Sequence, residues 1–290
     1  MSLALVSRTA AAAITRQADH DGELIRLWLH GRPATTRRAY AGDVDRFLVA
    51  VGKPLAQVAL GDVQAFADSL ADLAPPTQAR RLSPVESLLA FGQRIGVLPV
   101  NVGAALRLPR LRSRLAERIL PEATVQRLLA LETDPRNRAL LRLAYAGGLR
   151  VSELVGLAWR DLQPRDDAGQ VTVFGKGGKT RTVLLTAATW AELAALRKDA
   201  GADDPVFRSR RGGHLDPRQV RRIVLASARR AGLEAKVSPH WLRHAHASHA
   251  LDRGAPVHLV AATLGHASIA TTGKYAHARP SDSSSRYLAV

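Results

Sequence analysis

The sequence predicts a mainly α-helical protein with one small antiparallel β-hairpin or sheet, built as two domains. Apolar residues recur at helical spacing over most of the 290 residues. One segment, residues 170–186, instead alternates apolar and polar residues around a turn rich in Gly and Lys, which is typical of a β-hairpin. The length suits two ordinary domains, and a basic stretch without a helical period separates the two halves.

Four short helices are expected in the first half, because apolar residues line up on one helical face in each of four segments. These segments are residues 21–30, the stretch from Thr35 or Thr36 to about Leu48, residues 62–73 and residues 77–95. Thr35 or Thr36 is a candidate N-cap of the second helix. Pro84 lies inside the fourth pattern, where a proline either kinks a helix or marks its true start.

The second half is expected to be helical on both sides of the hairpin. The predicted helices cover residues 122–132, 136–146, 151–157, 187–198, 216–231, 240–253, 256–264 and 269–276. Asp216 is a good N-cap and is followed by Pro217 at the first helical position, and Ser238 with Pro239 repeats that start. Gly254 can end the helix that Pro239 opens.

A basic linker divides the predicted elements into two domains. We expect a leader over residues 1–18, a helical domain over 19–104, the linker over 105–118, and a second domain over 119–290 that ends in a tail from about residue 278. The linker is either a solvated connector or a strap that lies on a phosphate backbone.

The charge of the chain favours a polyanionic partner. The formal net charge is +17. Residues 1–110 contain 13 basic and 9 acidic residues, whereas residues 111–290 contain 29 and 16. A concentrated excess of this kind favours nucleic acid first and an acidic membrane surface second. Arg outnumbers Lys 36 to 6, so a bias in composition contributes to the excess, and one surface arginine alone carries little information.

Composition also disfavours several classes of protein. The chain has no cysteine, which excludes a disulfide framework and a thiolate metal site. No apolar run approaches the ~18 residues of a membrane span, and no basic amphipathic helix has an aromatic face. Arg8 interrupts the apolar patches of the first residues, so we interpret them as a loose leader rather than a signal peptide. We expect a cytoplasmic protein.

Four short pieces of sequence carry side chains suited to attack on a phosphodiester. Arg150 follows a glycine turn at a predicted helix start, where backbone amides and a guanidinium converge on an anion. His240 and Arg243 are three residues apart, so a helix places both on one face. His266 lies at a helix-ending glycine, and Tyr275 follows one short helix later. Each piece alone is more often a basic surface or a packing residue, and only their combination favours chemistry.

Two further patterns accompany this set. Lys176 occupies the hairpin turn, which lacks the spacing of a phosphate-binding loop, and it is either a solubilising residue or a mobile proton donor. His240 and His244 have the i, i+4 spacing of metal ligands, but neither a Glu at position 241 nor any cysteine accompanies them. We therefore expect no metal and no cofactor.

Four segments, taken in order and spacing, resemble motifs of the tyrosine recombinases, the phage-integrase and Xer-type family of site-specific recombinases. They are Tyr145–Leu154, Gly175–Arg181, His240–His244 and Leu264–Thr272, the last leading to Tyr275. The resemblance covers nearly all of the chain. The first half is similar, more loosely, to the family's helical, SAM-like core-binding domain, through Thr36 with Tyr40 and through Arg80–Ser83.

The resemblance implies a role for each candidate. Tyr275 would attack the scissile phosphate and form a 3′-phosphotyrosyl link that releases a 5′-hydroxyl. Arg150 and Arg243 would hold the non-bridging oxygens, where charge builds up in the transition state. Lys176 would protonate the leaving oxygen, and His240 would accept the tyrosine proton or assist its transfer. Neither ATP nor a metal would be needed, because the covalent link conserves the phosphodiester energy.

Further residues receive supporting roles by the same resemblance. His266 would hydrogen-bond the phosphate, and Glu153 would support Arg150 from behind. Lys179 is the alternative to Lys176 as the acid. Candidate DNA contacts are Arg37, Arg38, Arg80, Arg81, Lys179 and Arg181.

The resemblance also implies partners: double-stranded DNA, and three further copies of this chain or of a related recombinase in a tetramer. The tail would dock on a neighbouring protomer, with Tyr287 and Leu288 as its anchor. A nucleoid-associated, cytoplasmic location follows. Two alternatives stay open, namely DNA relaxation like that of a type IB topoisomerase, and a non-catalytic DNA-binding protein of the same fold.

Overall fold

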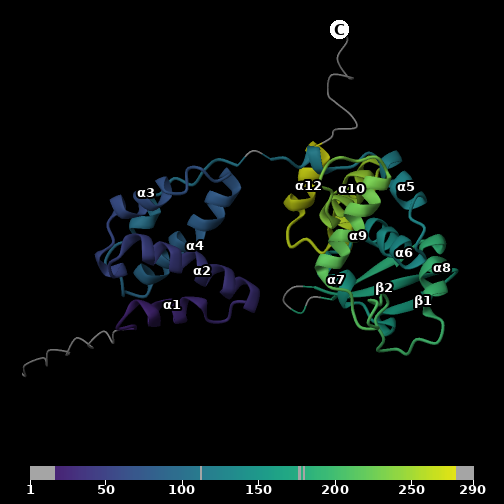
Figure 1. Ribbon diagram of the computed structural model, residues 1–290, viewed down its shortest axis with the longest axis horizontal. Helices are drawn as coiled ribbons and strands as arrows, with labels where there is room; N and C mark the ends of the chain where they lie inside the picture. Colours follow the sequence, from purple (N-terminus) through teal and green to yellow (C-terminus); the bar gives the residue numbers. More distant parts are fainter. Residues whose placement is uncertain (1–16, 112, 176–177, 179, 279–290) are drawn as a thin grey trace, which may run out of the picture. The chain divides into compact units, whose positions relative to one another are not determined.

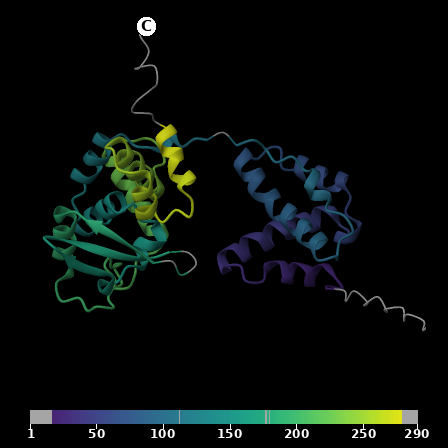
Figure 2. The same ribbon diagram turned by 180° about the vertical axis from the view of Figure 1, so that it is seen from behind.

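A computed structural model of the protein describes residues 17–111, 113–175, 178 and 180–278, with side chains described up to Tyr275 (Figures 1 and 2). The chain divides into two compact units, Met1–Arg112 and Ser113–Val290. Lys176, Lys179 and the tail from residue 279 lie outside the described residues, as do the first 16 residues of the expected leader. The mainly helical fold with a small antiparallel sheet is confirmed.

The smaller unit consists of helices around one apolar core. They are α1 (Asp21–Leu29), α2 (Ala34–Val51), η1 (Leu55–Gln57), α3 (Leu60–Asp68), α4 (Pro75–Arg94) and η2 (Val102–Ala105). Trp28, Val44, Phe47, Phe66 and Leu88 are buried together and hold these helices to one another. Burial of each such side chain contributes about 1.5–3 kcal/mol, and this packing stabilises the short helices α1 and α3, which would be marginal alone.

Three expectations for the smaller unit are corrected. Helix α2 begins at Ala34 after Pro33, so Thr35 and Thr36 lie inside its first turn, and no side chain among the described residues caps it. Helix α3 ends at Asp68, five residues before the expected Leu73. Helix α4 begins at Pro75, so Pro84 is a buried residue within the helix and does not mark its start.

The larger unit contains the remaining elements. They are η3 (Ala116–Arg118), α5 (Glu122–Ala130), α6 (Pro135–Ala146), α7 (Val151–Gly156), η4 (Trp159–Asp161), β1 (Leu162–Arg165), β2 (Ala168–Phe174), β3 (Thr180–Leu185), α8 (Ala187–Arg197), α9 (Pro217–Arg230), α10 (Pro239–Asp252), α11 (Val257–Leu264) and α12 (Ile269–Ala278). Each of the eight helices predicted in this half is present, with both ends within two residues of the expected positions. Helix α9 has the predicted cap, since the carboxylate of Asp216 accepts from the Arg218 amide at 2.6 Å.

The sheet has one strand more than the predicted hairpin. Strands β2 and β3 form the hairpin, and β1 pairs with β2 on its other side, antiparallel, in the order β1-β2-β3. Leu162, Val171 and Val183 lie across from one another and are buried, so one face of the sheet covers the core. The sequence does not reveal β1, because only Leu162 of its four residues is buried and no alternation results.

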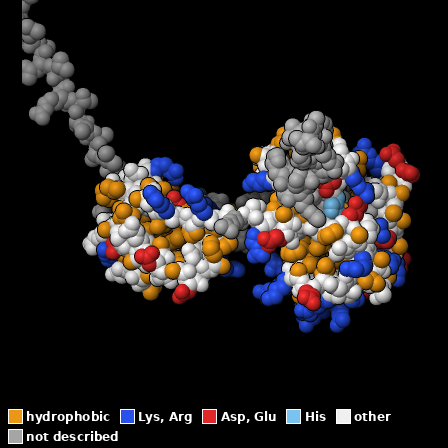
Figure 3. Space-filling view, turned by 90° about the horizontal axis from the view of Figure 1, so that it is seen from above, with side chains coloured by type: hydrophobic (Ala, Val, Ile, Leu, Met, Phe, Trp, Pro, Cys, Tyr) orange, Lys and Arg blue, Asp and Glu red, His pale blue; other side chains and the backbone are white. Residues whose placement is uncertain are grey.

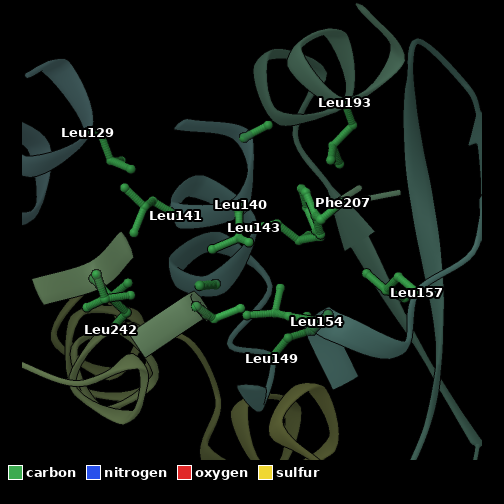
Figure 4. Close-up of a cluster of buried hydrophobic side chains, with 14 of the residues drawn as sticks. Leu129, Leu140, Leu141, Leu143, Leu149, Leu154, Leu157, Leu193, Phe207 and Leu242 are labelled. Carbon is green, nitrogen blue, oxygen red and sulfur yellow. The ribbon is translucent and has the colours of Figure 1, made fainter. Parts of the chain in front are cut away.

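The core of the larger unit gathers around α6. Figure 4 shows Leu140, Leu141 and Leu143 of this helix among apolar side chains from the surrounding elements, including Leu193 of α8 and Leu242 of α10. The three leucines of α6 are fully buried. This core fixes the end of α6, and thereby the turn that leads into α7.

A second, smaller cluster joins the last three helices. Ile119, Ala247, Val260, Leu264 and Tyr275 are buried against one another, so α10, α11 and α12 form one packed group. The motif segments His240–His244 and Leu264–Thr272 therefore meet here. The turn between α11 and α12 also comes close to the start of α7.

Candidate active site

Arg150 is held at the start of α7 by a turn that requires glycine. Gly148 has φ +58°, and a side chain at this position would bring its Cβ to 2.6 Å from Leu264. Arg150 is the N-cap of α7, and its backbone amide donates to Glu153 at 2.7 Å. Its guanidinium donates to Glu153 at 2.9 Å and to the carbonyl of Gly265 at 3.2 Å. The side chain is 34% exposed, so one part of the guanidinium is fixed and another part faces solvent.

Arg243 is buried and bound to the same turns. It is 4% exposed, and its guanidinium donates to the carbonyl of Gly148 and, at 2.6 Å, to that of Leu264. Burial lowers the pKa of Arg243 to about 10, and the charge of Arg150 adds to that effect. The group therefore stays charged at neutral pH. Two guanidinium groups thus share the turns at residues 148 and 264–265, which is the arrangement expected for an anion site.

The carboxylate of Glu153 binds two arginines, Arg150 and Arg181. Its carboxylate accepts from Arg150 and also accepts two hydrogen bonds from Arg181, at 2.8 and 2.9 Å. Burial alone would raise the pKa of Glu153, but hydrogen bonds from Arg181 and from the Arg150 amide outweigh it and lower the pKa to about 2. Glu153 is therefore ionised and balances part of the local positive charge.

The structure argues against the expected DNA contact at Arg181. Its three guanidinium nitrogens donate to Glu153 and to the carbonyl of Thr263, the latter at 2.7 Å, and the side chain is only 12% exposed. Arg181 connects strand β3 to α7 and to the end of α11. A basic residue in a hairpin looks exposed in the sequence, because its buried partner Glu153 lies 28 residues away in the chain.

Two of the predicted histidines lie at the edge of this cluster. His240 is exposed in the first turn of α10, but its ring is partly desolvated, and this, followed by the charge of Arg243, lowers its pKa. Nδ1 of His266 is 2.7 Å from the Thr272 hydroxyl. Burial lowers the pKa of His266 to about 4, and the charges of Arg243 and Arg150 act in the same direction. Both histidines are therefore mostly neutral at pH 7.

Tyr275 lies on α12 in contact with this cluster. Its ring is parallel to that of His266, at 5° with 6.4 Å between centroids, and its side chain is 6% exposed. The hydroxyl is 2.8 Å from Nδ1 of His244, the residue after Arg243. Burial raises the pKa of Tyr275, while the charge of Arg243 lowers it in part. The structure thus brings five of the six candidates together: Arg150, His240, Arg243, His266 and Tyr275.

The sequence singles out His244 only as a candidate metal ligand, and its place in the structure is different. It lies one turn after His240 on α10, and the two rings are 6.4 Å apart. The signal was its position in the quoted motif His240–His244, directly after an arginine that the resemblance makes catalytic. Sequence spacing does not show which histidine meets the tyrosine, because that depends on where α12 packs along α10.

The candidate DNA contacts of the smaller unit are of two kinds. Arg37 and Arg38 are exposed on α2. Arg80 instead donates to the buried carboxylate of Asp43 at 2.5 Å, which ties α4 to α2, although more than half of its side chain is exposed. Arg81 is half-buried. DNA contact by these arginines stays a prediction.

Comparison with known proteins shows relatives of this chain in sequence and in fold. Residues 116–282 match the model of the "Phage integrase family". The chain is 41% identical over 211 residues to tyrosine recombinase XerC of Xanthomonas campestris pv. campestris (strain B100), a match that covers 71% of this chain and 65% of the relative's length. It is 36% identical over 263 residues to XerC of Xylella fastidiosa (strain 9a5c), covering 85% of this chain and 87% of that protein.

A solved structure has the same fold. A lambda integrase tetramer bound to a Holliday junction superposes with a TM-score of 0.72 at 18% identity, over 88% of this chain and 75% of that one. In the part of the chain that the structure describes, no helix is both long enough and apolar enough to cross a membrane. From the family model and the XerC relatives together, the chain belongs to the phage integrase family, the tyrosine recombinases.

Proposed function

We propose that the protein is a site-specific DNA recombinase that cleaves and rejoins strands through a 3′-phosphotyrosyl intermediate. The observation that carries this proposal is the meeting of Arg150 and Arg243 with His266 and Tyr275 around the turns at residues 148 and 264–265. These elements are far apart in the sequence, and a purely structural arginine pair would not need a buried tyrosine and a neutral histidine beside it.

In the proposed reaction, the Tyr275 oxygen attacks the scissile phosphorus as the bond from phosphorus to the 5′-oxygen breaks. Arg150 and Arg243 stabilise the negative charge on the non-bridging oxygens, which is greatest in the transition state. A phenol has a pKa of about 10 and is a weak nucleophile at neutral pH, so cations beside it are required. The reverse attack by another strand's 5′-hydroxyl reseals the DNA without ATP or a metal.

The histidines have separate tasks in this proposal. If Nδ1 of His266 accepts from the Thr272 hydroxyl, the proton of the neutral ring is on Nε2, which can then donate to a phosphate oxygen. His240, exposed in the first turn of α10, accepts the proton that leaves Tyr275 or assists its transfer. Only a neutral imidazole can accept a proton, as the task of His240 requires, and the lowered pKa of His240 favours that form. The lowered pKa of His266 likewise favours its neutral form, which still donates from Nε2.

We assign the general acid to Lys176, with Lys179 as the alternative. Both lie outside the described residues. Support comes from the strand that follows the turn, because Arg181 of β3 is bound to Glu153 and to the carbonyl of Thr263. The β2–β3 hairpin is thereby tied to the elements that hold Arg150 and His266.

Double-stranded DNA is the proposed substrate. Figure 3 shows Lys and Arg side chains gathered along an edge of the larger unit. Arg118 and Lys236 line a shallow pocket together with His240 and His244, and these cations are suited to backbone phosphates beside the scissile one. The relatives' name, tyrosine recombinase, supports the same substrate class.

The domain roles and the assembly are also proposals. Residues 19–104 would form the core-binding domain, with Arg37, Arg38, Arg80 and Arg81 toward DNA, and residues 119–290 the catalytic domain. We propose a tetramer on DNA, supported by the fold shared with the lambda integrase tetramer. The tail from about residue 278 would contact a neighbouring protomer. A cytoplasmic, nucleoid-associated location accords with this substrate.

The test is covalent trapping on DNA without metal. Purified wild type and Tyr275→Phe are incubated, in the presence of a chelator, with nicked duplexes that carry randomised core sequences. We expect a denaturant-resistant protein–DNA adduct with wild type only, and sequencing of the trapped DNA then identifies the target. An adduct with Tyr275→Phe would contradict the assignment of the nucleophile, and no adduct with either protein would contradict the proposed function.

A relaxation assay separates the recombinase from its enzymatic alternative. A type IB topoisomerase would relax a supercoiled plasmid that lacks the trapped sequence. We expect no relaxation of that plasmid, and we expect strand exchange between two duplexes that both carry the sequence.

A further inference from the structure

Helix α10 makes two hydrogen bonds of the same kind to tyrosines in the described part of the chain. Nδ1 of His249 is 2.9 Å from the hydroxyl of Tyr145 on α6. Nδ1 of His244 is 2.8 Å from the hydroxyl of Tyr275 on α12. The second bond involves the atom that the proposed reaction uses as its nucleophile. The first offers a matched comparison, because it involves a tyrosine without a proposed chemical role.

The position of the Tyr275 hydroxyl is strongly restrained. The ring packs against Ala247, Val260 and Leu264, and α12 contacts both α10 and α11. Among the residues that the structure describes, His244 is the hydrogen-bond partner of this hydroxyl. A buried hydroxyl without a partner is destabilising, so this bond favours one orientation of the phenol over others.

The surroundings of His244 favour its neutral form. The ring is partly buried, and it faces Arg118 of η3, His240 and Arg243 of α10, His266 before α12, and Tyr275 itself. Burial lowers the pKa of His244 to about 4, and His240 and the cations around it act in the same direction. A neutral imidazole has one bare nitrogen, which can only accept. A phenol that donates to this nitrogen satisfies both groups.

We propose that His244 is a positioning residue for the nucleophile, and that its Nδ1 accepts the hydrogen of the Tyr275 hydroxyl and orients the phenol beside Arg243 and His266. The proposal rests on the proposed function and adds a residue to it. It also divides the work between two histidines on one helix. His244 orients the nucleophile from the protein side, whereas His240, exposed one turn earlier, is left to proton transfer at the entrance.

The kinetic test compares single-turnover rates of adduct formation on the trapped duplex. His244→Leu removes the acceptor while it keeps an apolar side chain of similar size, and we expect a rate about 30-fold lower, the scale of a small misplacement of a reacting group. His244→Asn retains an acceptor oxygen close to the position of Nδ1, and we expect it to restore most of the rate. Affinity for uncleaved DNA should change little in both variants.

His249→Leu is the matched control. It removes the same kind of bond from the same helix, but from Tyr145, and we expect a rate close to wild type even where stability falls. Equal slowing by His249→Leu and His244→Leu would mean that α10 is merely damaged, which would overturn the proposal. A wild-type rate in His244→Leu, or Asn as slow as Leu, would overturn it as well. If the Leu variant fails to fold, the Asn variant and the spectrum below decide.

A spectroscopic readout tests the direction of the bond without any turnover. Protein with ¹⁵N-labelled histidine, free of DNA, should show His244 at neutral pH with a bare Nδ1 and a protonated Nε2. Tyr275→Phe should shift the Nδ1 signal of His244 and leave His249 unchanged. A protonated Nδ1 would overturn the proposal. Wild type that forms no adduct would overturn the proposed function itself, whereas a fast His244→Leu beside an active wild type would overturn the positioning role alone.

Discussion

Two sets of arginines, one from each unit, are held in opposite ways. In the larger unit Arg150, Arg181 and Arg243 are bound to carbonyls and to one carboxylate, and their positions are fixed before any DNA arrives. In the smaller unit Arg37 and Arg38 are exposed on α2. A guanidinium that stabilises a transition state has to be preorganised, whereas one that neutralises a phosphate along a duplex can remain mobile. Residue type is the same in both, and the bonding partners make the difference.

Arg243→Lys should have the largest effect. Lysine cannot donate in two directions from one planar group, so the carbonyls of Gly148 and Leu264 and a phosphate cannot all be served. We expect adduct formation to fall about 10³-fold, in the range found when a transition-state donor is removed. Single-turnover trapping measures this. Arg165→Gln, an exposed change at the end of β1, is the control and should react like wild type. A loss below tenfold would mean that Arg243 only supports the fold.

Glu153→Gln tests the carboxylate behind the arginines. The change leaves Arg150 and Arg181 with a neutral partner, and we expect a loss of about 3 kcal/mol in the free energy of unfolding, the lower end of the range for a broken buried pair. Adduct formation should fall about 10–100-fold, because Arg150 is no longer fixed. Denaturant titration and trapping measure the two effects.

The contribution of Glu153 to the free energy of unfolding should depend on pH. The folded pKa of Glu153 is about 2, below the ordinary value of 4.5 for a glutamate. Its stabilising effect is therefore complete above pH 4.5 and is lost as the pH falls toward 2. The difference in unfolding free energy between wild type and Glu153→Gln should shrink over this window. A constant difference would mean that the variant acts through packing instead of charge.

Sequence and structure agree best where chemistry depends on local geometry. The spacing of His240 and Arg243, the glycine turn before Arg150 and the helix-ending Gly265 could all be interpreted from neighbours in the chain, and the structure has them as expected. The pairing of Arg181 with Glu153 could not, because both partners look like ordinary surface charges until β3 is packed against α7.

Strand β1 and the bond of His244 to Tyr275 could not be predicted either. Both depend on contacts with a second element of the structure. Strand β1 has too few buried residues to show a period, and it exists because β2 offers it an edge. The bond depends on how far along α10 the last helix docks, which the apolar contacts of Val260, Leu264 and Tyr275 decide. Contacts between distant segments therefore set the features that the sequence left open.

The smallest expected effects separate the two kinds of arginine most directly. Arg37→Ala and Arg38→Ala should each weaken DNA binding and reduce the slope of log affinity against log salt by about 0.9 if each neutralises one phosphate. Their unfolding free energy should stay within about 0.5 kcal/mol of wild type, because both side chains are exposed. Arg181→Lys should do the reverse: stability falls as the bidentate bond to Glu153 is lost, and the salt slope stays unchanged. A reduced salt slope in Arg181→Lys would show that this arginine leaves Glu153 for the phosphate backbone when DNA binds, and the contrast between fixed and mobile arginines would then fail at Arg181.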